Sequence, residues 1–122
     1  IIIMPHIPDK WYAFAVAQTY YEELISAGVQ IYEYTPGFVH AKVFVSDNDT
    51  ATVGTINLDY RSLYHHFECG TFIYNNPVVW EIERDFQNTL KACQKITMLD
   101  VKARRIGMKM VGRVLRLIAP LM

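Results

Sequence analysis

The sequence predicts an α/β domain in which a central mixed β-sheet is flanked by helices. Two segments, residues 10–27 and 78–95, repeat apolar residues at helical spacing. Short runs of strand-type residues precede the first helical segment and separate it from the second. A strand, a helix, several strands and a second helix in succession are typical of a layered α/β sandwich.

Local signals bound each expected element. Residues 1–4 form a continuous apolar run, as in a strand covered on both faces, and Pro5 ends it. The helix over residues 10–27 ends at Gly28, and residues 29–34 alternate apolar and polar side chains as a strand does. Further strands are expected at 43–45, 51–53 and 67–74, and the second helix begins after Pro77.

Size and composition indicate one domain with a single core. The chain has 122 residues, of which 52% are hydrophobic, and its 12 basic and 12 acidic residues cancel. The charges are unevenly placed, because residues 101–122 hold six basic residues and no acid. We therefore expect a moderately acidic domain over residues 1–100 and a basic amphipathic tail helix over residues 101–122.

Five basic residues of the tail fall in one narrow stripe when the tail is drawn as a helix, and apolar residues fill the other side. This pattern fits a helix that lies on an anionic lipid surface, and it also fits a terminal helix that docks on the domain with its basic face in solvent. The residues of the stripe, which we predict to contact a membrane, are Lys102, Arg105, Lys109, Arg113 and Arg116.

The stretch from His40 to Asn57 has the pattern of a β-hairpin with chemically useful side chains. The expected strands flank residues 46–50, a cluster of turn-forming side chains. Because side chains alternate along a strand, His40 and Lys42 are expected on one face. The return strand leads into Gly54, Thr55 and Asn57, which are small or rich in hydrogen-bond donors.

An imidazole beside a fixed cation suits attack on a phosphodiester. Such a site neutralises the non-bridging oxygens with Lys, Asn and hydroxyl donors while a histidine attacks phosphorus or protonates the leaving alkoxide. This chemistry needs neither a metal nor another cofactor. A metal site built from His65, His66 and His40 is a weaker alternative, because the sequence lacks ligand spacing and Lys42 repels a cation.

The same stretch resembles the signature of the phospholipase D superfamily, HxKxxxxD followed after six residues by G(S/T)xN. Every position is filled, by His40, Lys42, Asp47, Gly54, Thr55 and Asn57. The continuation LDYRSLYHHFECG is similar to that of the bacterial cardiolipin synthases, in which the motif runs into NLDxRS and then a Phe-Glu pair. Here that pair is Phe67 and Glu68.

The resemblance implies a phospholipase D-like fold that forms one half of a pseudo-twofold pair. Enzymes of the superfamily use two such motifs, with one histidine forming a phosphohistidine and the other acting as acid and then base. The chain has one motif, so we expect it to be the C-terminal half of a longer enzyme. The missing motif then comes from the N-terminal half of the same enzyme or from a homodimer partner.

The resemblance also implies roles for individual residues. His40 is expected to be the general acid/base, with Lys42, Thr55 and Asn57 binding the substrate phosphate. Glu68 lies where an acid of the superfamily orients a catalytic histidine. Asp47 belongs to the catalytic motif, but its position favours hydrogen bonding that holds the hairpin turn.

By the same resemblance, the parent enzyme transfers a phosphatidyl group between two phosphatidylglycerol molecules, giving cardiolipin and glycerol. Its partners are then an anionic phospholipid and the cytoplasmic face of the bacterial cell membrane, and the lipid interpretation of the tail becomes the preferred one. Cys69 and Cys93 form no CxxC pair and are expected to be reduced thiols. The first residue is not Met and no segment resembles a signal peptide or a span, so we interpret the sequence as a piece of a longer protein.

Two other functions remain open. The motif recognises a phosphodiester and not the groups attached to it, so a nuclease-type phosphodiesterase is one alternative. The acidic domain and the absence of a basic, aromatic groove argue against a nucleic-acid partner. The other alternative is an inactive lipid-binding half-module whose working part is the tail.

Overall fold

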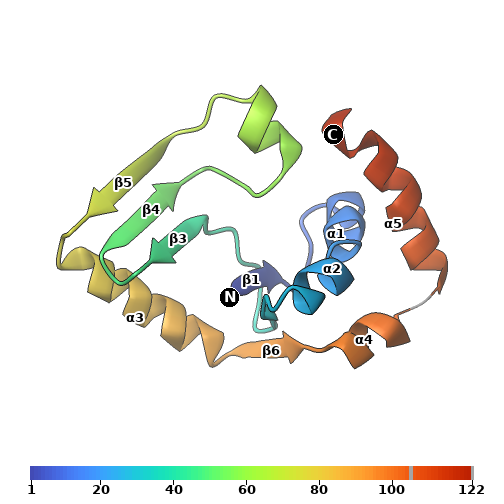
Figure 1. Cartoon of the computed structure of the whole chain (residues 1–122), viewed down its shortest axis with the longest axis horizontal. Coiled ribbons are helices and arrows are strands. Elements are labelled where there is room, and N and C mark those ends of the chain that lie inside the picture. Colours follow the sequence, from blue (N-terminus) through green and yellow to red (C-terminus); the bar gives the residue numbers. More distant parts are fainter. Residues whose placement is uncertain (105, 122) are drawn as a thin grey trace. The chain divides into compact units, whose positions relative to one another are not determined.

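A computed structural model describes residues 1–104 and 106–121 and confirms the α/β class. The chain divides into two compact units. The first unit joins Ile1–Val39 to Ala92–Met122, and the second comprises His40–Lys91. Each unit has a three-stranded sheet of its own, and Figure 1 shows the strands and helices of both.

The sheet of the first unit is mixed. It contains β1 (Ile2–Pro5), β2 (Ile31–Tyr34) and β6 (Cys93–Ile96), in the order β1-β2-β6. Strands β1 and β2 run parallel, whereas β6 is antiparallel to β2. The parallel pair is joined through helices, because parallel neighbours need a crossover connection.

Two helices form this crossover where the periodicity predicts one. They are α1 (Trp11–Gln18) and α2 (Tyr21–Ser26), so the expected single helix over residues 10–27 is wrong. The break falls at Thr19, whose backbone N–H and hydroxyl both donate to the carbonyl of Val16, at 2.9 and 2.6 Å. These bonds close the first helix with a tight turn, and Tyr21 then begins the second helix as a buried residue.

The core of the first unit forms where α2 and α4 cover the sheet. Its buried members are Tyr21 from α2, Ile31 and Ile96 from the sheet, and Val101 from α4. Met4, Leu24, Ile25 and Val29 pack against this cluster.

A buried carboxylate lies beside this core. Glu33 is only 4% exposed and accepts hydrogen bonds from three side chains on different elements. Its partners are Arg104 Nη2 at 2.9 Å, His6 Nδ1 at 2.9 Å and the Tyr21 hydroxyl at 3.3 Å. Burial and the adjacent Glu33 carboxylate raise the pKa of Tyr21 above its usual range. Because a buried charge must be paired, this cluster fixes the tail against β2 and α2.

The tail forms two helices and a short 3-10 turn instead of one helix over residues 101–122. They are α4 (Met98–Ala103), α5 (Ile106–Ile118) and η2 (Ala119–Leu121). Helix α4 begins early because Thr97 and Asp100 make a reciprocal capping box. It ends at Arg104, whose extended backbone has a ψ of 146°.

Helix α5 docks on α1. The approach is so close at Gly112 that a Cβ atom there would lie 2.6 Å from the carbonyl oxygen of Ala15. Glycine is therefore required at this position for the two helices to pack in the observed way.

The second unit contains the predicted hairpin and the strand after it. Strands β3 (Val43–Ser46), β4 (Thr50–Gly54) and β5 (Gly70–Tyr74) form an antiparallel sheet in that order. Helix α3 (Val78–Leu90) packs against β3 and β4. Ala51 and Val79 are both buried in this unit, so the sheet buries one face beneath the helix.

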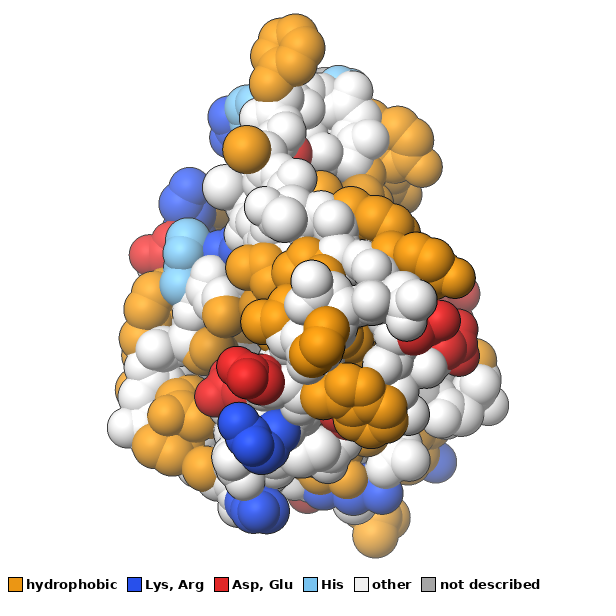
Figure 2. All heavy atoms as spheres, turned by 90° about the vertical axis from the view of Figure 1, so that its left-hand side faces the viewer, with side chains coloured by type: hydrophobic (Ala, Val, Ile, Leu, Met, Phe, Trp, Pro, Cys, Tyr) orange, Lys and Arg blue, Asp and Glu red, His pale blue; other side chains and the backbone are white. Residues whose placement is uncertain are grey.

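The other face of this sheet is apolar and exposed. Register pairs Phe44 with Thr52 and Thr52 with Phe72, so all three side chains lie on one face. Phe44 and Phe72 are exposed. Figure 2 views the side of the molecule on which β5 and α3 lie and shows hydrophobic side chains at the surface.

The expected helix over residues 78–95 is too long, because α3 ends at Leu90. The chain then forms β6, in which Cys93 pairs with Tyr34 and Ile96 pairs with Ile31. Burial of Ile96 and hydrogen bonding to β2 outweigh the helical periodicity that extends through Cys93. The expected strand over residues 67–74 also begins late, at Gly70.

Replacing Gly54 with alanine tests the close approach of β4 and β5. A Cβ atom at Gly54 would lie 2.3 Å from the carbonyl oxygen of Cys69 and 2.6 Å from the Cα of Gly70. Since backbone has to move, we expect Gly54→Ala to lower the free energy of unfolding by about 2 kcal/mol in urea titrations. Gly70→Ala is the matched control, because its Cβ atom would meet nothing closer than 3.7 Å. Equal stability of the two variants would contradict this account.

Candidate active site

The open end of the β3–β4 hairpin carries the first two motif residues. Strand β3 begins at Val43, where the sequence pattern predicts it, and His40 and Lys42 lie in the segment just before the strand. Antiparallel pairing nevertheless continues past Val43, because the N–H of Gly54 donates to the carbonyl of Lys42 at 3.1 Å. Lys42 and Gly54 are thereby held opposite each other, at the point where the chain leaves the sheet.

Lys42 also limits where the backbone of His40 lies. The Lys42 ammonium donates a hydrogen bond of 2.8 Å to the carbonyl oxygen of His40. The His40 side chain is exposed, so an incoming phosphodiester can reach the imidazole. The lysine therefore orients the segment before β3 while its charge stays near the histidine.

Thr55 is clamped between β4 and the segment before β5. Its backbone N–H donates to the carbonyl of Cys69 at 2.9 Å, and its hydroxyl oxygen accepts from the Cys69 N–H at 3.1 Å. The Thr55 hydroxyl proton is directed to Glu68 Oε2. The structure thus brings Thr55 and Glu68 together, and Gly54 makes this possible because no side chain separates the strands.

The Ser62 hydroxyl contributes to lowering the pKa of Glu68, and sequence reasoning did not assign it this role. Ser62 is buried and lies in η1 (Arg61–His65), a turn of π-helix closed by the His66 N–H on the Arg61 carbonyl at 2.8 Å. Asp59 Oδ1 accepts from the Ser62 N–H at 2.8 Å and caps this turn. The spacing of Asp59 and Ser62 is the signal that locates the cap.

The surroundings of Glu68 favour its ionised form. Hydrogen bonding to Thr55 and then to Ser62 lowers the pKa of Glu68, and the nearby Lys42 ammonium lowers it further. Glu68 is hydrogen-bonded to Thr55, and its predicted action on His40 stays a prediction.

The remaining motif residues occupy different places. Asn57 is exposed two residues beyond Thr55, so its amide is accessible to a ligand. Asp47 lies at the other end of β3, in the hairpin turn, where it has a φ of 53° and accepts a 3.0 Å hydrogen bond from Ser46. At roughly 3.3 Å per residue, β3 separates Asp47 from Lys42 by about 16 Å. The structure does not bring Asp47 to the other motif residues.

The histidines after the motif do not assemble a metal centre. Within residues 1–104 and 106–121, no group of three or more His, Cys, Asp or Glu side chains has the arrangement to hold a metal ion. His66 instead accepts a hydrogen bond from Arg61 Nε.

Comparison with known proteins identifies the family to which this arrangement belongs. Residues 1–90 match the family model described as cardiolipin synthase, phospholipase D-like domain. The chain belongs to this family. The match includes the hairpin with His40 and Lys42, the Thr55–Glu68 pair and the whole of α3, and it confirms the predicted phospholipase D-like fold.

Curated relatives of this phospholipase D-like chain align along nearly its whole length. An uncharacterized protein of Streptococcus mutans is 54% identical over 99% of the chain and 26% of its own length. A cardiolipin synthase of Clostridium perfringens is 40% identical over 99% of the chain and 25% of its own length. For a cardiolipin synthase 2 of Bacillus anthracis these values are 37%, 99% and 24%.

The phospholipase D-like chain thus spans about a quarter of the length of the curated relatives that it matches. No solved structure matches it significantly. None of the helices in the described part of the chain has the length and apolar character needed to cross a membrane.

Replacing Thr55 with valine tests the control of Glu68. Because the fold lowers the pKa of this carboxyl, its ionised form stabilises the folded state above the ordinary carboxyl pKa, and the contribution disappears as the pH falls through the lowered value. Thr55→Val removes the largest cause, so we expect the Glu68 titration to move to higher pH in carboxyl-carbon NMR spectra. Thr55→Ser keeps the hydroxyl and is expected to keep the low midpoint. An unchanged midpoint in the valine variant would refute the assigned hydrogen bond.

Proposed function

We propose that the chain supplies the C-terminal catalytic half of a cardiolipin synthase. The enzyme transfers a phosphatidyl group from one phosphatidylglycerol to a hydroxyl of another, yielding cardiolipin and glycerol. The observation that carries the proposal is the complete motif from His40 to Asn57 within a stretch matched by the family model. Relatives named cardiolipin synthase at 40% and 37% identity support the same substrate class.

Two histidines share the chemistry in this proposal. One attacks phosphorus and forms a phosphohistidine as the bond from phosphorus to the glycerol oxygen breaks. His40, as the general acid, gives a proton to that leaving oxygen. It then takes the proton from the hydroxyl of the second phosphatidylglycerol, whose oxygen attacks phosphorus and releases the first histidine.

The donors of the site stabilise the charge that develops on phosphorus. Lys42 and Asn57 are assigned to the non-bridging oxygens, where preorganised donors lower the barrier most. The Thr55 hydroxyl has a single proton, which Glu68 accepts in this structure. Its expected bond to phosphate therefore requires release of Glu68 and stays a prediction, whereas its bond to the carboxylate supports a role in positioning Glu68.

Replacing His40 with alanine tests the assignment. In a full-length synthase that contains this chain, we expect His40→Ala to lower cardiolipin formation from phosphatidylglycerol by at least about 100-fold, since a general acid/base contributes 10²- to 10⁴-fold. Product is measured by lipid mass spectrometry. His65→Ala is the matched control, because His65 is an exposed histidine of η1. Undiminished cardiolipin from the His40 variant would disprove the role.

The second motif of the active enzyme comes from the N-terminal half of the same enzyme or from a second copy of the chain. The same assay on the isolated chain in mixed micelles separates the two sources. Cardiolipin from the isolated chain would indicate a homodimer, and absence of product would indicate that the other half is required. Phosphatidic acid as the product would indicate hydrolysis at the same site.

The tail is proposed to hold the enzyme on the cytoplasmic face of the bacterial membrane. Helix α5 docks on α1 through Gly112, yet Met110, Val114 and Leu117 on another face are exposed. Lys102 and Arg113 add positive charge that favours anionic lipid. Of the predicted membrane-contact residues, Arg105 and the side chain of Lys109 lie outside the described part of the chain, and Arg116 is partly engaged with Glu23.

Replacing Leu117 with glutamine tests this contact. Leu117 is 82% exposed, and moving a leucine side chain out of water is worth roughly 1.5–3 kcal/mol. We therefore expect Leu117→Gln to weaken binding to phosphatidylglycerol vesicles about tenfold or more in a sedimentation assay. Ile7→Gln is the control, because Ile7 is an exposed apolar residue outside the tail. Equal binding by both variants and the parent chain would rule out the proposed contact.

A further inference from the structure

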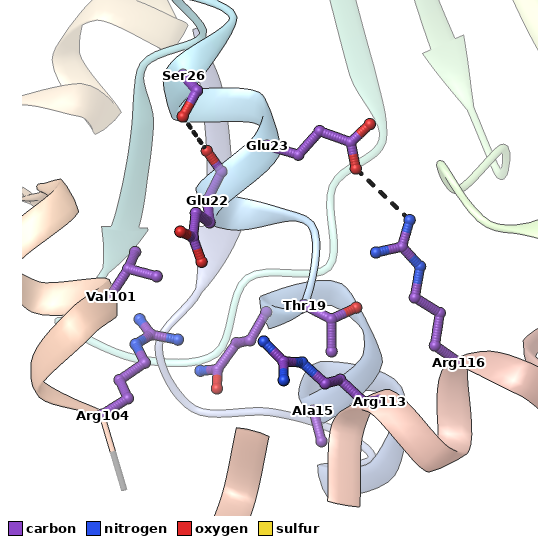
Figure 3. A pocket seen from close by; sticks show the side chains of 10 residues that line it. Ala15, Thr19, Glu22, Glu23, Ser26, Val101, Arg104, Arg113 and Arg116 are labelled. Carbon is purple, nitrogen blue, oxygen red and sulfur yellow. Dashed lines mark hydrogen bonds and ion pairs between the residues drawn. The ribbon is translucent and has the colours of Figure 1, made fainter. Parts of the chain in front are cut away.

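A cavity of about 320 Å³ lies among α1, α2, α4 and α5 of the first unit. Three arginines and two glutamates line it, so its wall is charged and carries an excess of cations. Figure 3 shows Arg104, Arg113 and Glu22 pointing into the space between the helices, while Arg116 reaches toward Glu23. The other lining residues are Ala15, Gln18, Thr19, Ser26 and Val101.

Two of the three arginines are paired with carboxylates, Arg104 with Glu33 and Arg116 with Glu23. Arg116 lies 3.5 Å from Glu23 and stacks over the ring of Tyr20 at 3.9 Å. These contacts join α5 to α2 and leave its charge compensated. Two hydroxyls of the wall are also engaged, because Thr19 donates to the Val16 carbonyl and Ser26 donates to the Glu22 carbonyl.

Arg104 has one satisfied and one unsatisfied nitrogen. Its Nη2 donates to Glu33 at 2.9 Å, and its guanidinium lies over the ring of Tyr21 at 4.9 Å. Its Nη1 is buried and has no hydrogen-bond partner among the described residues. A buried donor in this state gains most from an acceptor that enters the cavity.

Arg113 supplies the second set of donors. Neither an ion pair nor a hydrogen bond of its guanidinium occurs within the described part of the chain, although the side chain lines the cavity. Two guanidinium groups that converge on one space match the geometry of a phosphate, because each presents paired N–H donors to phosphate oxygens.

We propose that this cavity binds the headgroup of a glycerol phosphodiester, with the phosphate on Arg104 and Arg113. The proposal rests on the proposed function, because phosphatidylglycerol carries this headgroup. Glu22 and Gln18 lie in the same wall and accept hydrogen bonds from hydroxyl groups. The glycerol end of the headgroup supplies such hydroxyls, whereas inorganic phosphate offers little to Glu22 except charge repulsion.

The surface beside Arg113 favours a lipid as the source of this headgroup. Met110 precedes Arg113 by three residues and Leu117 follows it by four, so the three side chains share one side of α5. Both apolar neighbours are exposed. A phospholipid held by its phosphate in the cavity can therefore lay its acyl chains along these residues.

The test uses soluble headgroup without acyl chains, so that binding is separated from membrane adsorption. Glycerophosphoglycerol is titrated into the chain, and the Nε–H signal of Arg113 and the side-chain amide of Gln18 are followed by NMR. We expect saturable shifts at both signals and binding at least tenfold weaker in Arg113→Gln. Arg84→Gln removes the same charge from α3, outside the cavity, and is expected to bind as the parent chain does.

Further measurements distinguish a lipid headgroup from free phosphate and separate this proposal from the proposed function. Inorganic phosphate is expected to bind more weakly than glycerophosphoglycerol. Glu22→Ala is expected to reduce the difference in affinity between the two ligands. Equal binding of both ligands by the parent chain, no saturable shift, or equal weakening by the Arg84 variant would each overturn the proposal. His40→Ala is expected to leave this binding intact, so loss of transfer and loss of headgroup binding are measured independently.

Discussion

The close approach of β4 and β5 at Gly54 is the constraint on which the candidate site depends. With no side chain at Gly54, the Cys69 carbonyl comes within 2.3 Å of where a Cβ atom would lie. This approach sets the hydrogen bonds between Thr55 and Cys69, and they in turn direct the Thr55 hydroxyl to Glu68. The same glycine donates to the carbonyl of Lys42, so one residue aligns three strands at the edge where the motif lies.

The sequence predicts most of the second unit because its signals are local. Turn-forming residues between two β-branched runs define the hairpin, and Asp47 and Asn48 adopt the positive φ angles that such a turn requires. The first unit is harder to predict, because its strand β6 depends on a distant partner. Cys93 and Ile96 continue the helical period of α3, and only pairing with β2 makes them a strand. Tyr21 similarly breaks the first helix to reach the core and Glu33.

Some residues of the candidate site can likewise be predicted from local sequence, whereas others depend on the fold. The predicted hairpin places Lys42 and Thr55 at its open end, because they directly flank β3 and β4. The influence of Ser62 on Glu68 could not be predicted, because a π-helical turn has no periodic apolar signal in the sequence. Asp47 is the opposite case, because the motif includes it although it lies in the hairpin turn, at the end of β3 away from Lys42.

The buried Glu33 carboxylate makes the first unit more than a support for the tail. Its bond to Nη2 of Arg104 orients that guanidinium and leaves Nη1 buried without an acceptor among the described residues. Because Arg104 is paired with Glu33 and Arg116 with Glu23, Arg113 is the lining arginine without a carboxylate partner among the described residues. A surface built only for nonspecific attraction to lipid has no need of a buried, half-satisfied guanidinium. Helix α5 docks on α1 with one face and exposes apolar side chains on another. This arrangement favours recognition of one headgroup in addition to general adsorption to lipid.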